Sequence, residues 1–309
     1  MRVVFCGNPG FAVPTLETLL ASSHEVTAVV CSPDKPRGRG QKLQPLPVKD
    51  YALRSGVPVL QPVKLKDPDF LSSMRQIEPD CFVVVAFRIL PHEMFALPRL
   101  GSFNVHPSLL PRGRGPAPIP WTLIRGETET GVTIIRLSEE IDGGDILLQE
   151  RIPVAPDDNY GKLHDTLSQL GAKLLLNVLD AFEAGNPPPS WTQNASEVTK
   201  APKLFANDFE LDWTLSAIEL VNRIRAFSPL PGATTMVMGK RLKILSAAET
   251  DNLHNLLPGQ IKQTDRESLL VGTGYGALWL KSIQPEGKRP MTVGEFLRGR
   301  PQLPERFGQ

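Results

Sequence analysis

The stretch RVVFCGNPGFAVPTLETLLASSHEVTAVVC (residues 2–31) decides the fold class of this chain. Its two ends, RVVFC and EVTAVVC, are continuous apolar runs rich in β-branched residues, a pattern typical of strands that are covered on both faces. Between them, FAVPTLETLLASS places apolar residues at helical spacing and stops at serines. A strand, a helix and a second strand in this order predict a βαβ unit with parallel strands.

The same alternation continues along the chain. PVKDYALRSG (residues 47–56) has helical spacing, and residues 160–185 form one long amphipathic helical pattern. Three more apolar runs, DCFVVVAF, GVTIIRL and DILLQERIPV, indicate further strands at 80–87, 131–137 and 145–154. We therefore predict an α/β fold over residues 1–185, a doubly wound and mostly parallel sheet.

The stretch AGNPPPS (residues 184–190) marks the clearest boundary, because three consecutive prolines neither continue a helix nor enter a central strand. We expect a linker over residues 186–204. After it, a helical pattern leads into short strand runs separated by Gly, Pro and Asn turns, which indicate a small antiparallel barrel. This second domain, an OB-like β-barrel, is predicted for residues 205–309.

The composition excludes several classes of protein. Among 309 residues, 34 Lys and Arg nearly balance 33 Asp and Glu, so a nucleic-acid or membrane partner would have to be met by a local patch. The three cysteines lie in apolar runs without a CxxC pair, which favours core positions in a reducing compartment. No apolar run has the length of a membrane span, and we expect a cytoplasmic protein.

The segment FNVHPSLLPRGRG contains two polar side chains suited to chemistry. Asn104 and His106 are two residues apart in a predicted strand, so they point to one face. Pro107 breaks the strand directly after them. If the strand belongs to the parallel sheet, this break is its carboxyl edge, where open α/β proteins bind ligands.

Two carboxylates follow in SEEIDGGDIL. Asp142 or Asp145 could orient His106 and favour its protonated form, the arrangement that moves protons near neutral pH. Spacing alone does not decide between the two. The plainer interpretation is a hairpin turn beside an interior histidine.

The motifs FNVHPSLLPRGRGPAPI and IDGGDILLQ resemble the catalytic core of the 10-formyltetrahydrofolate-dependent formyltransferases. Others along nearly the whole chain, among them VVFCGNPGFAVPTLETLL, SPDKPRGRGQKLQPLPVK and RIRAFSPLPGA, resemble the methionyl-tRNA formyltransferases of that family. The resemblance implies a Rossmann-like catalytic domain, a C-terminal tRNA-binding barrel, 10-formyltetrahydrofolate as formyl donor and initiator methionyl-tRNA as acceptor in translation initiation. We also expect a monomer and no metal.

The resemblance also implies site residues. Its catalytic set falls on Asn104, His106 and Asp142, and leaves Asp145 as a turn residue. The folate-binding residues that it implies are Ser108, Leu109, Leu110, Pro111, Ala86, Phe87 and Ile89. The chain departs from the family in the pterin loop, where Phe87-Arg88 stands in place of Tyr-Gly and one further residue.

The chemistry explains the need for these residue types. An α-amino group has a pKa near 8, so a fraction of it is neutral at pH 7 and needs little activation. The formyl oxygen gains negative charge, which Asn104 and a protonated His106 can stabilise. Asp142 with His106 is suited to carry the proton from the attacking nitrogen to the departing folate nitrogen.

The pentapeptide PRGRG occurs twice, at residues 36–40 and 111–115, with flanks that do not match. The first copy lies in a Gly/Pro-rich segment with four cations, Lys35, Arg37, Arg39 and Lys42, which by itself is typical of a solvated loop. The resemblance implies that it reaches the tRNA acceptor arm. We interpret the second copy as a rigid connector, with substrate contact by Arg112 or Arg114 as the alternative.

Three other functions stay open at this point. A formyltransferase for glycinamide ribonucleotide or an amino-sugar nucleotide shares the catalytic core but needs neither the basic insertion nor this second domain. An NAD-dependent oxidoreductase is disfavoured because FCGNPGF offers only Gly7 and Gly10 and lacks the GxGxxG spacing. A non-catalytic tRNA-binding module is disfavoured by the intact Asn, His and Asp set.

Overall fold

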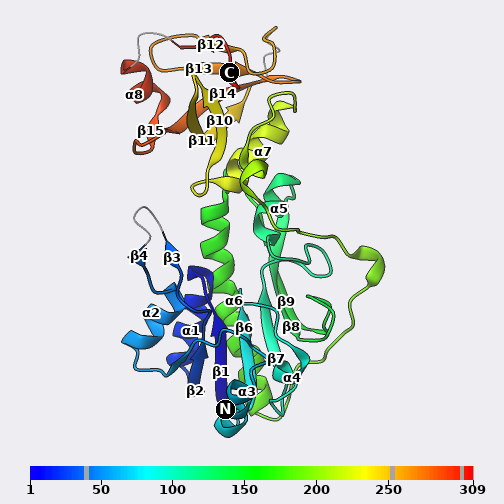
Figure 1. Ribbon diagram of the computed structural model, residues 1–309. Helices are drawn as coiled ribbons and strands as arrows, with labels where there is room; N and C mark the ends of the chain where they lie inside the picture. Colours follow the sequence, from blue (N-terminus) through cyan, green and yellow to red (C-terminus); the bar gives the residue numbers. More distant parts are fainter. Residues whose placement is uncertain (38–41, 251–254, 300–302, 309) are drawn as a thin grey trace. The chain divides into compact units, whose positions relative to one another are not determined.

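The computed structural model describes residues 1–37, 42–250, 255–299 and 303–308 (Figure 1). The chain divides into two compact units, each described here by itself. The first comprises Met1–Pro118, Glu129–Pro153 and His164–Pro202, and the second Ile119–Thr128, Val154–Leu163 and Lys203–Gln309. The domain limits inferred from the sequence stay a prediction.

The first unit is built on a seven-stranded sheet in the order β5-β2-β1-β6-β7-β8-β9 (Figure 1). The pairs from β5 through β7 are parallel and the two pairs that follow are antiparallel. The strands are β1 Arg2–Gly7, β2 Glu25–Val30, β5 Val59–Leu60, β6 Cys81–Val85, β7 Ser102–His106, β8 Glu129–Arg136 and β9 Ile146–Pro153. The predicted α/β fold with a mostly parallel sheet is confirmed.

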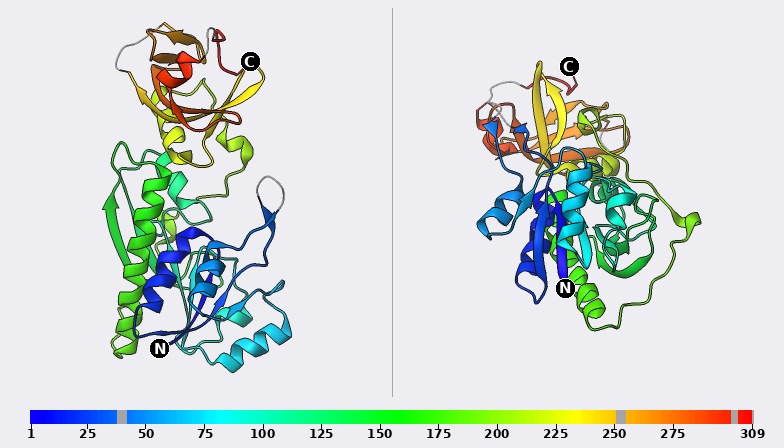
Figure 2. Two further views of the ribbon diagram at one scale, coloured as in Figure 1. Left: turned by 90° about the vertical axis from the view of Figure 1, so that its left-hand side faces the viewer. Right: turned by 60° about the horizontal axis from the view of Figure 1, so that its bottom comes forward.

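Helices connect and cover these strands. Those wholly within the first unit are α1 Val13–Leu20, α2 Pro47–Arg54, α3 Pro68–Ile77 and α4 His92–Phe95, with the short turns η1 Gly10–Ala12 and η2 Ala195–Glu197. Two more, α5 Pro118–Ile124 and α6 Tyr160–Glu183, contain residues of both units. The long green α6 runs beside the sheet (Figure 2), and the ring of Phe182 lies 5.1 Å from that of Phe103 in β7. This contact packs the end of α6 against the strand that carries the predicted catalytic residues.

The three cysteines are buried and free. Burial raises the pKa of the Cys31 and Cys81 thiols to about 12, and it also raises the pKa of Cys6. They therefore behave as core residues, as the apolar runs around them predict.

The second unit holds an antiparallel sheet in the order β10-β11-β14-β13-β12, with β15 paired to β14. Its strands are β10 Ala233–Val237, β11 Lys240–Glu249, β12 Ile261–Gln263, β13 Leu269–Gly272, β14 Ala277–Pro285 and β15 Met291–Thr292; its helices are η3 Ala206–Phe209, α7 Ala217–Phe227 and α8 Val293–Arg298. The predicted antiparallel sheet is confirmed. Among the described residues no pairing joins β12 to β10, so the ladder stays open and forms no closed barrel.

No helix in the described part of the chain combines the length and the apolar character that crossing a membrane requires.

Candidate active site

The strand order of the first unit reverses between β1 and β6, because β2 and β5 lie on one side and β7 on the other. In open α/β sheets, ligands bind outside the carboxyl ends of the strands at such a reversal. The strand β7, which ends at His106, is the next neighbour of β6 and brings its last residues to this edge. The predicted catalytic histidine thus lies where the topology favours a ligand.

His106 is buried, and each of its ring nitrogens faces an acceptor. Nε2 lies 2.9 Å from the carbonyl oxygen of Gly113, and Nδ1 lies 3.6 Å from Oδ1 of Asp142. Nε2 is therefore within hydrogen-bond distance of the Gly113 carbonyl, while Nδ1 faces the Asp142 carboxylate at a longer distance.

Asp142 is held by the backbone of the second PRGRG copy. Its Oδ2 accepts a hydrogen bond of 2.8 Å from the N–H of Gly115, and its own φ of +55° turns the chain sharply before β9. The other carboxylate, Asp145, is exposed and accepts from the Thr192 hydroxyl at 3.0 Å. The structure thus brings Asp142 to His106 and leaves Asp145 in the turn.

Asn104 completes the predicted set. It is half-buried in β7, in register with Val84 of β6 and Ile135 of β8. Its amide makes no side-chain hydrogen bond to any residue that the structure describes. The two N–H groups of this amide are therefore available to a ligand at the sheet edge.

The glycines of the second PRGRG copy have conformations that other residues rarely adopt. Gly113 has φ +75° and donates its N–H to the Thr199 hydroxyl at 2.9 Å. Gly115 has φ +124°, and a Cβ there would lie 2.5 Å from the carbonyl oxygen of Ala201. Only glycine fits at this position. Because the same loop binds His106 and Asp142, its backbone fixes their geometry.

The two arginines of that loop differ. Arg114 donates from Nε to Oε1 of Gln193 at 3.0 Å and pairs with Glu140, while Arg112 is exposed. The intramolecular contacts of Arg114 support the interpretation of this copy as a connector. Arg112 alone keeps the alternative of substrate contact.

The predicted folate motif, Ser108 to Pro111, forms a tight turn directly after β7. The Ser108 hydroxyl donates to the Arg112 carbonyl at 2.6 Å, and the Leu110 N–H donates to the Thr133 hydroxyl at 3.2 Å. The side chains of Ser108 and Leu110 are buried, whereas Leu109 is half-buried. A ligand would therefore meet this turn mainly through its backbone and Leu109.

The predicted pterin loop follows β6. Ala86 is exposed with φ +47°, Ile89 is 71% exposed, and Phe87 is half-buried. Arg88 lies with its guanidinium 5.2 Å from the centre of the Phe87 ring and donates to the carbonyls of Pro62 and Val63, at 2.9 and 3.1 Å. Burial lowers the pKa of this guanidinium. The residue that departs from the family pattern thus ties two loops together.

The predicted tRNA-binding residues follow β2. Lys35 is exposed, and β3 (Pro36–Arg37) pairs antiparallel with β4 (Lys42–Leu43). Arg39 lies outside the described residues. We refer to residues 33–45 as the basic arm.

The root of the basic arm is anchored by a polar network. Lys49 pairs with Asp34 and donates to Oε1 of Gln61 at 2.7 Å. Gln61 in turn donates to the Ser32 carbonyl at 2.9 Å. The residues at the start of the basic arm are therefore held in place by side-chain contacts.

Sequence reasoning missed the residues of the predicted linker. Gln193, Thr199 and Ala201 belong to the first unit and contact the loop or the turn that holds the predicted catalytic pair. A polar stretch after three prolines is typical of a solvent-exposed connection, so the sequence carried no signal for this role.

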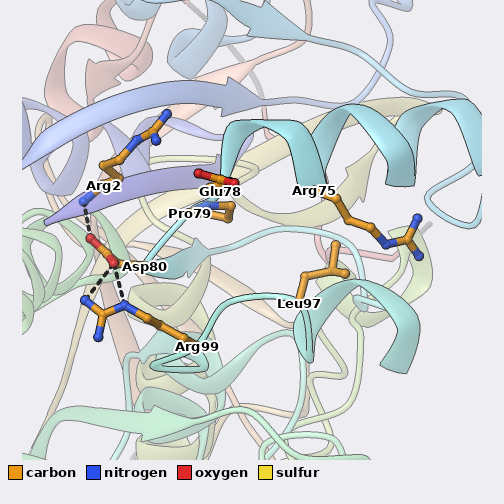
Figure 3. Close-up of a pocket in the computed structure, with 7 residues that line it drawn as sticks. All are labelled: Arg2, Arg75, Glu78, Pro79, Asp80, Leu97 and Arg99. Atoms are coloured by element: carbon orange, nitrogen blue, oxygen red, sulfur yellow. Dashed lines mark hydrogen bonds and ion pairs between the residues drawn. The ribbon is translucent and has the colours of Figure 1, made fainter.

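A pocket of about 500 Å³ lies where β1 and β6 begin, at the amino-terminal edge of the sheet (Figure 3). It is lined by Arg2, Arg75, Glu78, Pro79, Asp80, Leu97 and Arg99. Asp80 accepts a hydrogen bond from the backbone N–H of Arg2 at 2.7 Å and another from Nε of Arg99 at 2.8 Å. The guanidinium of Arg75 points away from Asp80 (Figure 3). None of the predicted site residues lies there.

His24, Asp180 and Glu183 are the one group of possible metal ligands found in the described residues. His24 Nε2 lies 3.1 Å from Asp180 Oδ1, and Glu183 pairs with the Met1 amino group at 2.6 Å. Glu183 is therefore already paired with a cation, and Asp180 lies beside the ring of His24. The group joins the start of β2 to the end of α6.

Comparison with known proteins identifies the family. The family described as Formyl transferase matches residues 1–179, and its C-terminal domain matches residues 203–301. The methionyl-tRNA formyltransferase of Moorella thermoacetica is 44% identical over 305 residues, 98% of each chain. The chain belongs to the methionyl-tRNA formyltransferase family. The member from Syntrophus aciditrophicus is 46% identical over 300 residues, 97% of this chain and 96% of that protein.

Solved structures share the formyltransferase fold at lower identity. An N-formyltransferase from Helicobacter canadensis, in complex with folinic acid and dTDP-3-aminofucose, superposes with a TM-score of 0.69 at 20% identity, over 91% of this chain and 99% of that one. HypX from Aquifex aeolicus, in complex with tetrahydrofolic acid, gives 0.63 at 21% identity over the whole of this chain and 50% of that one. Both support the fold of this methionyl-tRNA formyltransferase family member.

Proposed function

We propose that this protein transfers the formyl group of 10-formyltetrahydrofolate to the α-amino group of methionyl initiator tRNA. The observation that carries the proposal is the buried His106 facing the half-buried Asp142, with the free amide of Asn104 in the same strand, at the carboxyl edge of the sheet, in a chain of this family. The product would serve translation initiation in the cytoplasm.

The reaction forms one bond and breaks one. The neutral α-amine attacks the formyl carbon, the carbonyl oxygen becomes negative, and the bond from that carbon to the folate nitrogen then breaks. The Asn104 amide stabilises the negative oxygen, and removal of one such preorganised donor typically costs about 10² to 10³ in rate. Asn104 is the donor that requires no rearrangement, because its amide has no other hydrogen-bond partner among the described residues.

His106 and Asp142 handle the proton. The attacking nitrogen must lose a proton, and the leaving folate nitrogen must gain one. Asp142 accepts the proton from the attacking nitrogen, and His106 donates a proton to the folate nitrogen, directly or through a bound water. To do this, the N–H on Nε2 of His106 must leave its hydrogen bond with the Gly113 carbonyl and turn to the substrate. The 2.8 Å bond from Gly115 keeps Asp142 in place throughout.

The two substrates meet the catalytic pair from different segments. We propose that the folate contacts the pterin loop, through Ala86, Phe87 and Ile89, and the turn from Ser108 to Pro111. We propose that the basic arm, through Lys35, Arg37, Arg39 and Lys42, contacts phosphates of the tRNA acceptor arm. Cations on an arm suit this task because phosphate attraction is strong and tolerates many orientations. The protein would act as a monomer, with residues 1–185 catalytic and 205–309 assisting tRNA binding.

One assay tests the proposed function. The purified protein is mixed with 10-formyltetrahydrofolate and charged initiator tRNA, and formyl-methionine is measured after the ester is hydrolysed. Charged elongator tRNA, glycinamide ribonucleotide and an amino-sugar nucleotide are the control acceptors. We expect rapid formylation of the initiator alone. Formylation of a small amine and not of the initiator would overturn the proposal.

A further inference from the structure

The side chain of Gln193 lies between the turn and the loop that hold the predicted catalytic pair. It is only 8% exposed. Nε2 donates to the carbonyls of Asp142 and Gly144, at 2.7 and 2.8 Å, and Oε1 accepts from Nε of Arg114 at 3.0 Å. Both amide hydrogens and one oxygen lone pair are therefore used, which is a pattern that only an amide of this length supplies.

The segment around Gln193, residues 191–201, is bonded near both of its ends to the same two elements; we name it the strap. Trp191 exchanges two backbone hydrogen bonds with Ile146, at 2.9 and 3.1 Å, directly after the catalytic turn. Thr199 accepts from the N–H groups of Gly113 and Arg114, through its hydroxyl and its carbonyl, both at 2.9 Å. The strap thus fastens the turn at one end and the loop at the other.

The turn that Gln193 holds is tight. Asp142 has φ +55°, and a Cβ on Gly144 would lie 1.7 Å from the carbonyl oxygen of Arg136. Two carbonyls of this turn aim at one side chain, so loss of that side chain leaves buried acceptors without a partner. The turn then relaxes, and the carboxylate of Asp142 moves with its backbone.

We propose, resting on the proposed function, that Gln193 is a positioning residue for formyl transfer. Through the carbonyls of Asp142 and Gly144 it sets where the Asp142 carboxylate lies relative to His106. Through Arg114 it ties the same turn to the loop whose carbonyl faces His106. Gln193 touches neither substrate, so it acts on the rate of the chemical step and not on substrate affinity.

The test uses the amide-to-carboxylate exchange Gln193→Glu, which keeps the length and turns two donors into acceptors facing two carbonyls. We expect kcat to fall about 10- to 100-fold, because a displacement of about 1 Å at a catalytic group costs this much. The KM values for both substrates should stay within about twofold. Asn194→Asp is the matched control: it makes the same exchange at the next position, where the side chain is exposed and bonds only within its own turn. It should retain wild-type kcat.

A double-mutant cycle separates positioning from general loss of structure. If Gln193 acts through Asp142, Gln193→Glu should lower kcat by less than about twofold when Asp142 is already replaced by Asn. Independent, multiplying effects would overturn the proposal, and so would wild-type kcat in Gln193→Glu. Gln193→Ala, with unfolding followed by circular dichroism, repeats the cycle if the Glu variant does not fold.

Failure of the proposed function would look different. If the wild-type protein formylates a small amine and not charged initiator tRNA, the acceptor assignment fails, and the same cycle is run with that amine. If the wild-type protein formylates the tRNA and Gln193→Glu keeps its kcat, the positioning role alone fails.

Discussion

The two PRGRG segments have the same five letters and different physics. At residues 111–115 the backbone holds the predicted catalytic pair: a carbonyl faces His106, an N–H donates to Asp142, and both glycines have positive φ angles. At residues 36–40 the described part is one two-residue strand, β3, which pairs with β4 next to an anchored base, and the predicted function belongs to the charges. The role of such a short motif therefore depends on the residues that the fold places around it.

The largest effect is expected when the carboxylate of Asp142, which the second copy holds, is removed. Asp142→Asn keeps the shape and removes the proton acceptor, so we expect kcat to fall about 10³-fold, within the range of acid–base catalysis, with KM values little changed. Steady-state formylation assays measure this. Asp145→Asn, three residues on in the same turn, is the control and should retain most activity. Equal losses in both variants would show that the whole turn matters and not the carboxylate facing His106.

Gly115→Ala tests whether backbone space at the second copy is essential. Its Cβ would meet the Ala201 carbonyl at 2.5 Å, so the loop must shift and Asp142 loses its hydrogen bond. Gly56→Ala is the control, because Gly56 has φ +73° with open space around it. An alanine there destabilises the fold only through this backbone conformation, by about 1 kcal/mol.

We expect Gly115→Ala to lose about 1–3 kcal/mol more of the free energy of unfolding than the control, by urea titration. It should also lose kcat. Equal losses in the two variants would show that the contact with the strap is unimportant.

Arginine at the second letter of each copy gives the next comparison. Arg37→Ala should raise the KM for tRNA and reduce the slope of log affinity against log salt concentration by about one, as for one lost phosphate contact. Arg112→Ala, at the equivalent position of the second copy, should leave that slope unchanged. Folate binding should be unaltered in both. If Arg112→Ala changes the slope as much as Arg37→Ala does, both copies contact RNA and the contrast fails.

The smallest effect is expected at the pterin loop, which belongs to neither copy. Arg88→Met keeps much of the side-chain stem and removes the hydrogen bonds to Pro62 and Val63. We expect the KM for the folate to rise about three- to tenfold, the net contribution of one or two hydrogen bonds, while tRNA kinetics stay constant. Arg99→Met, at the opposite edge of the sheet, is the control. An unchanged KM for the folate would show that the contacts of Arg88 do not affect folate binding.

The sequence predicted the parts of the site that depend on local pattern. Alternation along one strand placed Asn104 and His106 on one face, and β7 ends at His106, next to the predicted break at Pro107. The β-branched runs predicted the parallel strands because burial on both faces leaves a direct trace in composition.

The rest depends on contacts between residues far apart in the chain. The resemblance assigned the role to Asp142, but spacing alone did not choose between Asp142 and Asp145, because it encodes neither the φ of +55° nor the hydrogen bond from Gly115. Gln193 was missed because its contacts come from Arg114 and from the turn of residues 142–144, which are distant in the sequence. Residue type alone predicts a solvated glutamine there.

Because its cysteines are buried, this protein is suited to fluorescent labelling at an introduced cysteine. Thiol reagents attack the thiolate, and burial together with the raised pKa values keeps Cys6, Cys31 and Cys81 in the unreactive form. A single cysteine introduced at Lys35, which is exposed, would therefore accept a fluorophore alone, without prior removal of the native thiols. The basic arm could then be followed by fluorescence while RNA is added.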